Sequence, residues 1–218
     1  MTYEALKKDP FIRALIQQAD KSLSALGFTE HSFAHVGRVA ETARYILETM
    51  DYSEHEVELA MMAAYLHDIG NLVNRIEHSQ SGATLAFTIL EKTDMCAEDI
   101  ATIVTAIGNH DEGTGVAVNP VAAALILADK SDVRRSRVRN SDVSTFDIHD
   151  RVNYSVERAD LAINDTHTEI TLSLTVDSQY SSVMDYFEIF LGRMVMCRKA
   201  AECLGLSFKL NINGQPLM

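Results

Sequence analysis

The pair His67-Asp68 is the most distinctive chemical feature of the sequence, because it directly follows an apolar, helix-like run in AYLHDIGN. An ionised carboxylate buried without a partner is costly, and a nearby cation removes that cost. Imidazole and carboxylate groups together are typical ligands of transition-metal ions. The dipeptide also fits an ordinary helix end, where the helix dipole stabilises a histidine. The metal hypothesis therefore depends on further ligands in equivalent positions.

Four more candidate ligands share this placement at helix ends. His35 and His78 begin predicted helices, in HVGRVAETA and IEHSQSGA, whereas His110 and Asp129 end two others, in GNHDEG and LILADK. Side chains at helix ends can converge at one end of a helical bundle. The combined nitrogen and oxygen donors suit iron, manganese, zinc, cobalt or nickel rather than calcium. We therefore expect a divalent transition-metal centre.

A basic segment follows Asp129. Five positive charges oppose one negative charge over residues 130–139. Arginine side chains bind phosphate oxygens with two parallel hydrogen bonds, so this segment is a candidate phosphate site; the alternatives are a solvated basic face or ion pairs to the acidic remainder. Arg38, one helical turn after His35, could reach the same site or pair with Glu41. The candidate phosphate-binding residues are Lys130, Arg134, Arg135, Arg137 and Arg38.

The remaining histidines and one loop carry weaker expectations. His31 lies four residues before His35 and could share its helical face, so it is a candidate to support that ligand or to contact substrate; the alternative is an exposed cap. The loop of residues 111–119 contains glycine and is either a flexible rim over the site or a plain connector. The histidines expected at the surface are His55, His149 and His167.

The elements before residue 140 are predicted to be helices. An apolar stripe at helical spacing runs through residues 36–50. Ser53 and Glu56 form a capping-box signature before an apolar helix, and Asn119-Pro120 is typical of another helix start. Further helices are predicted over about residues 79–91 and 98–108. We expect residues 1–140 to form an all-α domain that positions the candidate ligands.

The pattern changes after residue 140. Apolar and polar residues alternate in TEITLSLTV, residues 168–176, which predicts a half-buried strand. Residues 151–163 are predicted to be its hairpin partner, with Asn164-Asp165 in the turn. A long helix from about Ser181 to Leu204 and a short strand over residues 208–212 complete the chain. We expect a mainly α protein in which residues 141–218 form a small α+β element that serves dimerisation or substrate selection.

Composition limits the class of partner. The chain has 218 residues, of which 47% are hydrophobic and 23% charged, as in ordinary globular proteins. Its net charge of -12 argues against long nucleic acids. No apolar run approaches the ~20 residues that span a membrane, and the N-terminus lacks a signal-peptide core. Three cysteines without CxxC spacing, Cys96, Cys197 and Cys203, indicate a reducing compartment. We expect a cytoplasmic protein with a small-molecule partner.

The order of the candidate ligands resembles a known family. His35, His67-Asp68 and Asp129 follow the H...HD...D pattern of the HD superfamily of metal-dependent phosphohydrolases, and HVGRVAETA is similar to that family's first helix. The EHSQSGA and NHDEG segments resemble the two-metal branch that includes the bacterial dinucleoside tetraphosphate hydrolases. The residue after Gly70 is Asn71, which departs from many cyclic-dinucleotide phosphodiesterases of the superfamily.

The resemblance implies an HD-type helical bundle with a metal centre of two divalent ions. Two such ions can activate a water molecule and hold phosphoryl oxygens, with His67 and Asp68 as the catalytic pair. The implied substrate is a small phosphate ester or a nucleotide. The implied first-metal ligands are His35, His67, Asp68 and Asp129, with His78 and His110 on the second metal and Asp68 bridging.

Two other functions remain open at this point. Some relatives with this fold use a di-iron site to activate oxygen, and their ligands are also histidines and carboxylates. A regulatory module that binds a ligand without turnover is the other alternative, although such a module has no chemical need for all six ligands.

Overall fold

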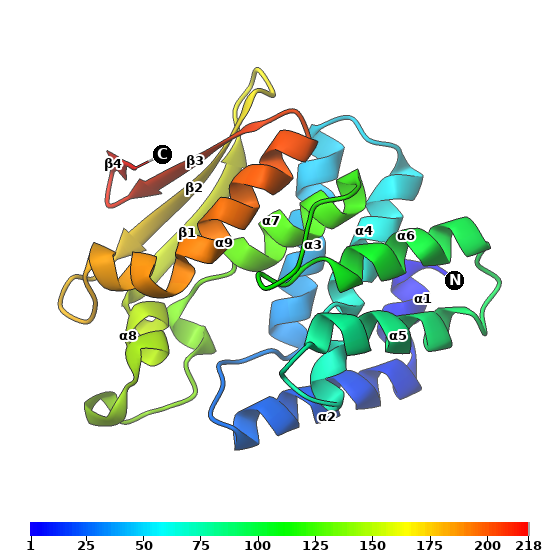
Figure 1. The fold of residues 1–218 in the computed structure, drawn as a ribbon, viewed down its shortest axis with the longest axis horizontal. Helices are drawn as coiled ribbons and strands as arrows, with labels where there is room; N and C mark the ends of the chain where they lie inside the picture. The colour runs from blue at the N-terminus through cyan, green and yellow to red at the C-terminus, as the bar shows by residue number, and fades with distance from the viewer. Residues whose placement is uncertain (218) are drawn as a thin grey trace.

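A computed structural model describes residues 1–217 as a helical bundle joined to a small four-stranded sheet (Figure 1). The bundle contains the first seven α-helices, and the long helix α9 lies between the sheet and the bundle helix α7. This arrangement confirms the prediction of a mainly α fold with a small C-terminal α+β element. The helices of the bundle are α1 (Tyr3–Lys8), α2 (Pro10–Ala25), α3 (Phe33–Thr49), α4 (Glu54–Leu66), α5 (His78–Leu90), α6 (Ala97–Gly108) and α7 (Pro120–Ser131), with the short 3-10 helix η1 (Ile69–Leu72) after α4.

Local sequence signals explain where the central helices begin. Ser53 and Glu56 form the predicted capping box at the start of α4. The side chain of Asn119 accepts a hydrogen bond from the amide of Ala122, and Pro120 occupies the first position of α7. Both helices are buried on nearly all sides, which matches their continuous apolar sequences. They form the rigid centre from which the metal-binding side chains project.

The C-terminal element begins with a helix that the sequence analysis missed. Residues 151–155 were expected in a strand, but they belong to α8 (Ile148–Ser155), and β1 (Val156–Ile163) starts only after it. The side chain of Asp147 accepts a hydrogen bond from the amide of Asp150 and so starts α8. This cap overrides the weak strand pattern of the segment.

The sheet has the strand order β1-β2-β3-β4. β1 and β2 (Glu169–Val176) form the predicted antiparallel hairpin, whose turn is closed by the side chain of Asn164. α9 (Val183–Cys203) then crosses over, so that β3 (Ser207–Ile212) pairs with β2 in parallel, and Leu172 lies beside Leu210. The two-residue strand β4 (Gln215–Pro216) follows β3. Two short 3-10 helices, η2 (Arg135–Arg137) and η3 (Val143–Thr145), connect α7 to α8.

The bundle and the C-terminal element share one hydrophobic core. Buried residues of β2 and β3 and of α9 belong to the same apolar cluster as those of α4 and α7. The predicted boundary near residue 140 therefore separates two regions of the chain but not two cores. Among residues 1–217, no helix has the length and apolar character that a membrane span requires.

Candidate metal centre

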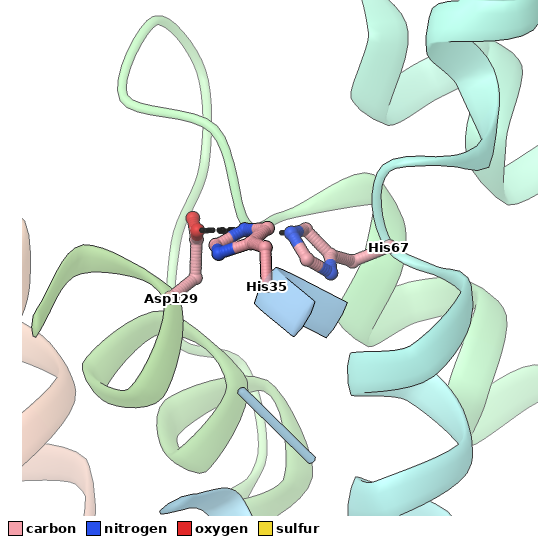
Figure 2. A group of neighbouring side chains, drawn as sticks. All are labelled: His35, His67 and Asp129. Atoms are coloured by element: carbon pink, nitrogen blue, oxygen red, sulfur yellow. Dashed lines mark ion pairs between the residues drawn. The ribbon is translucent and has the colours of Figure 1, made fainter. Parts of the chain in front are cut away.

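Three side chains from three different helices meet at one end of the bundle. His35 lies in the first turn of α3, His67 caps the C-terminus of α4, and Asp129 lies in the last turn of α7 (Figure 2). Asp129 Oδ1 lies 3.3 Å from His35 Nε2 and 3.6 Å from His67 Nε2. The two rings are buried, with no measurable exposed area. The placement at helix ends therefore brings these residues together as the sequence predicts.

Asp68 lies between this group and a second group of imidazoles. Its Oδ2 atom is 3.1 Å from His67 Nε2 and 3.5 Å from His35 Nε2. Its Oδ1 atom is on the other side, 3.6 Å from His78 Nε2. Asn71 donates a hydrogen bond of 2.8 Å to Oδ1 and fixes the orientation of the carboxylate. A carboxylate in this position has one oxygen available to each of two neighbouring sites.

The second group consists of His78 and His110. The ring of His110 packs edge-on against both His67 and His78, with centroids 4.9 Å and 5.0 Å apart. Donor atoms of His67, Asp68 and His110 lie close enough to hold one ion, as do those of His35, His67 and Asp129. His67 thus belongs to both possible donor groups. All six predicted ligands converge on one centre.

Hydrogen bonds on the far side of each ring fix its orientation. The Nδ1 atoms of His67, His78 and His110 lie 2.7, 3.1 and 2.6 Å from backbone carbonyl oxygens of the preceding turn. His35 differs, because its Nδ1 lies 2.7 Å from Oδ2 of buried Asp132. Partners of this kind fix the tautomer of a metal-binding histidine and leave Nε2 free to bind the ion. Sequence analysis did not identify Asp132 as such a partner.

The surroundings of the centre fit a bound cation. The Nε2 atoms of His35 and His67 and the Oδ2 atom of Asp68 are buried without a hydrogen-bond partner. Buried polar atoms are nearly always paired, and leaving one unpaired costs about 1–3 kcal/mol. Three such atoms around one point match the donor types of a divalent transition-metal ion. The described residues therefore fit the metal centre that the sequence predicts.

The charges of the metal-free centre are strongly coupled. Burial disfavours a charged His67, but the carboxylates of Asp68 and Asp129 outweigh this effect and raise its pKa to about 10. Burial also opposes ionisation of Asp68, yet the charge of His67 holds the pKa of Asp68 well below its usual range. Burial lowers the pKa of His110, so this ring stays neutral. In the metal-free protein a proton on His67 thus compensates the carboxylates.

Gly70 allows the two ligand-bearing segments to approach each other. A Cβ atom at this position would lie 1.9 Å from the backbone oxygen of His78 and 2.5 Å from the amide nitrogen of Gly82. Any side chain would therefore separate η1 from the start of α5. This contact holds His78 beside Asp68. The glycine of the HDIG sequence thus has a packing role in the centre.

The predicted phosphate role of the basic segment is not supported by its surroundings. Lys130 is buried and pairs with Asp129 Oδ2 at 2.8 Å and with Glu112 at 3.4 Å. Arg137 is buried as well, and donates to the carbonyl oxygens of Glu30 and Asp132. Lys130 and Arg137 therefore bind groups of the protein itself around the centre, which corrects their expected phosphate contacts.

Three arginines line a different groove. Arg134 pairs with Asp132 and Glu30, and Arg135 donates to the carbonyl oxygen of Tyr154. Arg38 lies 3.6 Å from Asp132, and Glu41 pairs instead with Arg44. Arg38, Arg134 and Arg135 line a groove of about 900 Å³ between α3, the end of α7 and β1. The lining of this groove includes Asp132, the partner of His35, and the phosphate contacts of these three arginines stay a prediction.

Other predicted residues lie where they were expected. The half-buried ring of His31 packs edge-on against His35, with centroids 5.5 Å apart, and its Nδ1 lies 2.7 Å from the carbonyl oxygen of Thr29. His55, His149 and His167 are exposed. The role of the loop of residues 111–119, as a flexible rim or a plain connector, stays a prediction. The free cysteines are exposed Cys96, buried Cys197 and exposed Cys203.

Two residues beside the second group were not predicted. Arg75 Nη1 lies 3.3 Å from His78 Nε2 and 3.9 Å from Asp68 Oδ1. Asp111 Oδ1 lies 3.9 Å from His78 Nε2 and is a further possible oxygen donor. The sequence signal that could have identified Arg75 and Asp111 is that they lie close in sequence to His78 and His110. An exposed arginine or aspartate in a loop is too common to be singled out by that signal alone.

Comparison with known proteins identifies the family. A family model described as the HD domain matches residues 32–151, more than half of the chain. The chain belongs to the HD domain family. This membership supports a metal-dependent phosphohydrolase in general. The matched region contains all six predicted ligands and ends within α8, so most of the C-terminal element lies outside it.

The chain is also similar to a curated protein and to a solved structure. An uncharacterised protein of Methanocaldococcus jannaschii is 25% identical over 189 residues, covering 76% of this chain and 72% of that protein. A crystal structure of a predicted HD superfamily hydrolase from an uncultured Thermotogales bacterium has 22% sequence identity and a TM-score of 0.43, covering 60% of this chain and 73% of that one. The branch with dinucleoside tetraphosphate hydrolases stays a prediction.

Proposed function

We propose that this protein hydrolyses a small phosphate ester or nucleotide at a centre that holds two divalent transition-metal ions. The observation that carries the proposal is the position of Asp68, whose two oxygens face different groups of imidazoles at 3.1–3.6 Å. A carboxylate shared in this way is the natural bridge of a dinuclear site. Family membership supports the same general chemistry.

Each predicted ligand of the centre has a distinct proposed role. His35, His67 and Asp129 would hold one ion, and His78 and His110 would hold the other, with Asp68 between them. When bound, such ions lower the pKa of a water molecule and neutralise charge on phosphoryl oxygens. Asp68 would also help to orient the attacking water between the two metal positions.

The ligand side chains of this centre are preorganised by their hydrogen-bond partners. Backbone carbonyl oxygens and Asp132 orient the imidazole rings, so little reorganisation is needed when the ions bind. Lys130 pairs with the Oδ2 atom of Asp129 and leaves Oδ1 facing the two histidines. The buried setting excludes bulk water, which strengthens the electrostatic interactions on a phosphoryl group.

The test is hydrolysis of a phosphoester panel by the full chain loaded with manganese under anaerobic conditions. The panel contains mononucleotides, dinucleoside polyphosphates, cyclic nucleotides and p-nitrophenyl phosphate. We expect phosphate release from at least one class, and its loss on chelation. Asp68→Asn should lower kcat by more than the about 10–100-fold that is typical of a residue which only supports a ligand. Asp165→Asn, in an exposed turn, is the matched control.

Two results would contradict the proposal. One is inactivity over the whole panel by protein whose metal content has been confirmed by elemental analysis. The other is oxygen consumption by iron-loaded protein combined with inactivity of the manganese form, which would favour the oxygenase alternative. Full activity with manganese in the absence of oxygen eliminates that alternative.

A further inference from the structure

A second cavity, of about 340 Å³, adjoins the metal centre. One wall comes from the bundle and includes Phe28, His31 and Arg75. The opposing elements, α8 and α9, contribute His149, Phe190 and Arg193, among others. His31 packs against the ring of His35 and Arg75 lies beside His78, so two residues that line the cavity contact predicted metal ligands. Its size is at the lower end of the range for small-molecule sites, about 300–1,000 Å³.

Arg75 presents donors to this cavity that the protein does not use. Its polar contacts are all through Nη1, which lies 3.3 Å from His78 Nε2, donates a long hydrogen bond of 3.4 Å to Asn71 and approaches Asp68 to 3.9 Å. The guanidinium lies 5.8 Å from the ring of Phe28, and the side chain is about one quarter exposed, at 28%. A guanidinium has five donors, so most of those on Arg75 are available to a ligand.

Arg193 is held in a similar way on α9. Its Nε forms an ion pair with Glu112 Oε1 at 2.7 Å, and its guanidinium stacks 4.4 Å from the centre of the Phe190 ring. Among the described residues, neither terminal nitrogen of Arg193 donates a hydrogen bond. Glu112 also pairs with Lys130, which in turn pairs with Asp129. Arg193 is therefore fixed at a defined place relative to the metal centre with its outer edge free.

The other charged groups of the cavity already have partners. Asp147 accepts a hydrogen bond from the amide of Asp150, whose carboxylate lies 3.3 Å from the amide nitrogen of Asn140. Arg137 donates to two backbone carbonyl oxygens. Asp147 and Asp150, on the α8 side, each accept one hydrogen bond among the described residues, whereas Arg75 and Arg193 keep unused donors and permanent positive charge. The two guanidinium groups fit a ligand with anionic oxygens.

We infer that the substrate carries a second anionic group, a phosphate or a carboxylate, which binds Arg75 and Arg193 while the first phosphoryl group lies at the metal centre. The inference rests on the proposed function and extends it to the class of substrate. It also gives the C-terminal element a role, since Arg193 comes from α9, outside the region that matches the family. Arg75 and Arg193 are specificity-determining residues in this account.

The experiment compares three small phosphate esters of similar size with the full chain. Glycerol phosphate has one anionic group, phosphoglycerate adds a carboxylate, and propanediol bisphosphate adds a second phosphate. Initial rates with manganese-loaded protein give kcat and KM, and calorimetry with metal-free protein gives binding affinities without turnover. We expect at least one doubly anionic compound to exceed glycerol phosphate about tenfold in both kcat/KM and affinity, and the stronger one identifies the second group.

Arg193→Gln should reduce this preference to less than about threefold, mainly through KM. Arg198→Gln, at an exposed position on the same helix, is the matched control and should keep the full preference. Equal affinity of wild-type protein for all three compounds would overturn the inference, as would an Arg193→Gln variant with unchanged preference. If none of the compounds is hydrolysed, the calorimetric order still decides the inference, whereas the proposed function is decided by the wider panel.

Discussion

At the scale of single residues, the centre depends on charges that compensate one another at close range. Asp132 illustrates this, because one of its oxygens accepts from His35 and the other from Arg134. Burial opposes its ionisation, but hydrogen bonding to His35 keeps the pKa of Asp132 well below its usual range. His35 thus receives a permanent acceptor on Nδ1, which directs Nε2 toward the metal position.

The raised pKa of His67 predicts that metal binding displaces a proton. Because this pKa is about 10 in the metal-free protein, His67 is charged near pH 7 and cannot act as a ligand until it is deprotonated. Protons compete with the metal ion for His67, and this competition decreases as the pH rises. Metal affinity should therefore increase by up to about tenfold per pH unit for each proton released. Calorimetry in buffers of different ionisation enthalpy, from about pH 6 to pH 8.5, measures this release. An affinity independent of pH, with no proton release, would contradict the assignment.

The ligands could be predicted from the sequence, whereas several of their partners could not. His67 and Asp68 follow an apolar helix, and this placement is visible locally. The hydrogen bond between His35 and Asp132 joins residues that are 97 positions apart, so no local pattern reports it. The positive charge of the segment after Asp129 is evident in the sequence. The acidic residues that pair with these charges are identified only by the fold.

At the scale of elements, the close approach of η1 and α5 sets the distance between the two groups of ligands. Gly70→Ala would place a methyl group against the backbone of His78, and neither backbone can yield easily. We expect a loss of at least about 2 kcal/mol in the free energy of unfolding, together with weaker binding at the second metal position. Denaturant unfolding and a metal titration measure the two effects.

Gly192→Ala provides the control for this substitution. Gly192 lies in α9, and a Cβ atom there would have no neighbour within 4 Å. Alanine is favoured over glycine in a helix by about 1 kcal/mol, so this variant should be as stable as the wild type or more so. A Gly70→Ala protein with unaltered stability and metal binding would show that the approach of η1 to α5 is not required.

Helices and strands with a clear period of apolar residues could be predicted from the sequence. An element whose start depends on a single N-cap residue could not. The alternation of β2 and the stripe of α3 appear in the sequence at once. α8 is only eight residues long and depends on the Asp147 cap, so its pattern is weaker than that of the strand after it. The parallel pairing of β2 with β3 also follows from the crossover of α9, which local sequence does not specify.

At the scale of the whole molecule, the C-terminal element completes the cavity next to the metal centre. α9 packs on α7 and contributes Phe190 and Arg193 to that cavity, while its other side packs on the sheet. The net charge of -12 is compatible with a small anionic substrate, because Arg75, Arg137 and Arg193 give the cavity a local positive charge. A homodimer formed through the C-terminal element stays a prediction.

The central claim, that Asp68 joins two metal positions, is tested most directly by locating the ions. Crystals of the manganese-loaded full chain should give two anomalous scattering peaks per chain, with Asp68 contacting both. We expect His35, His67 and Asp129 around one peak, and His78 and His110 around the other. A single peak, with His78 and His110 turned away from Asp68, would contradict the account and leave a mononuclear centre.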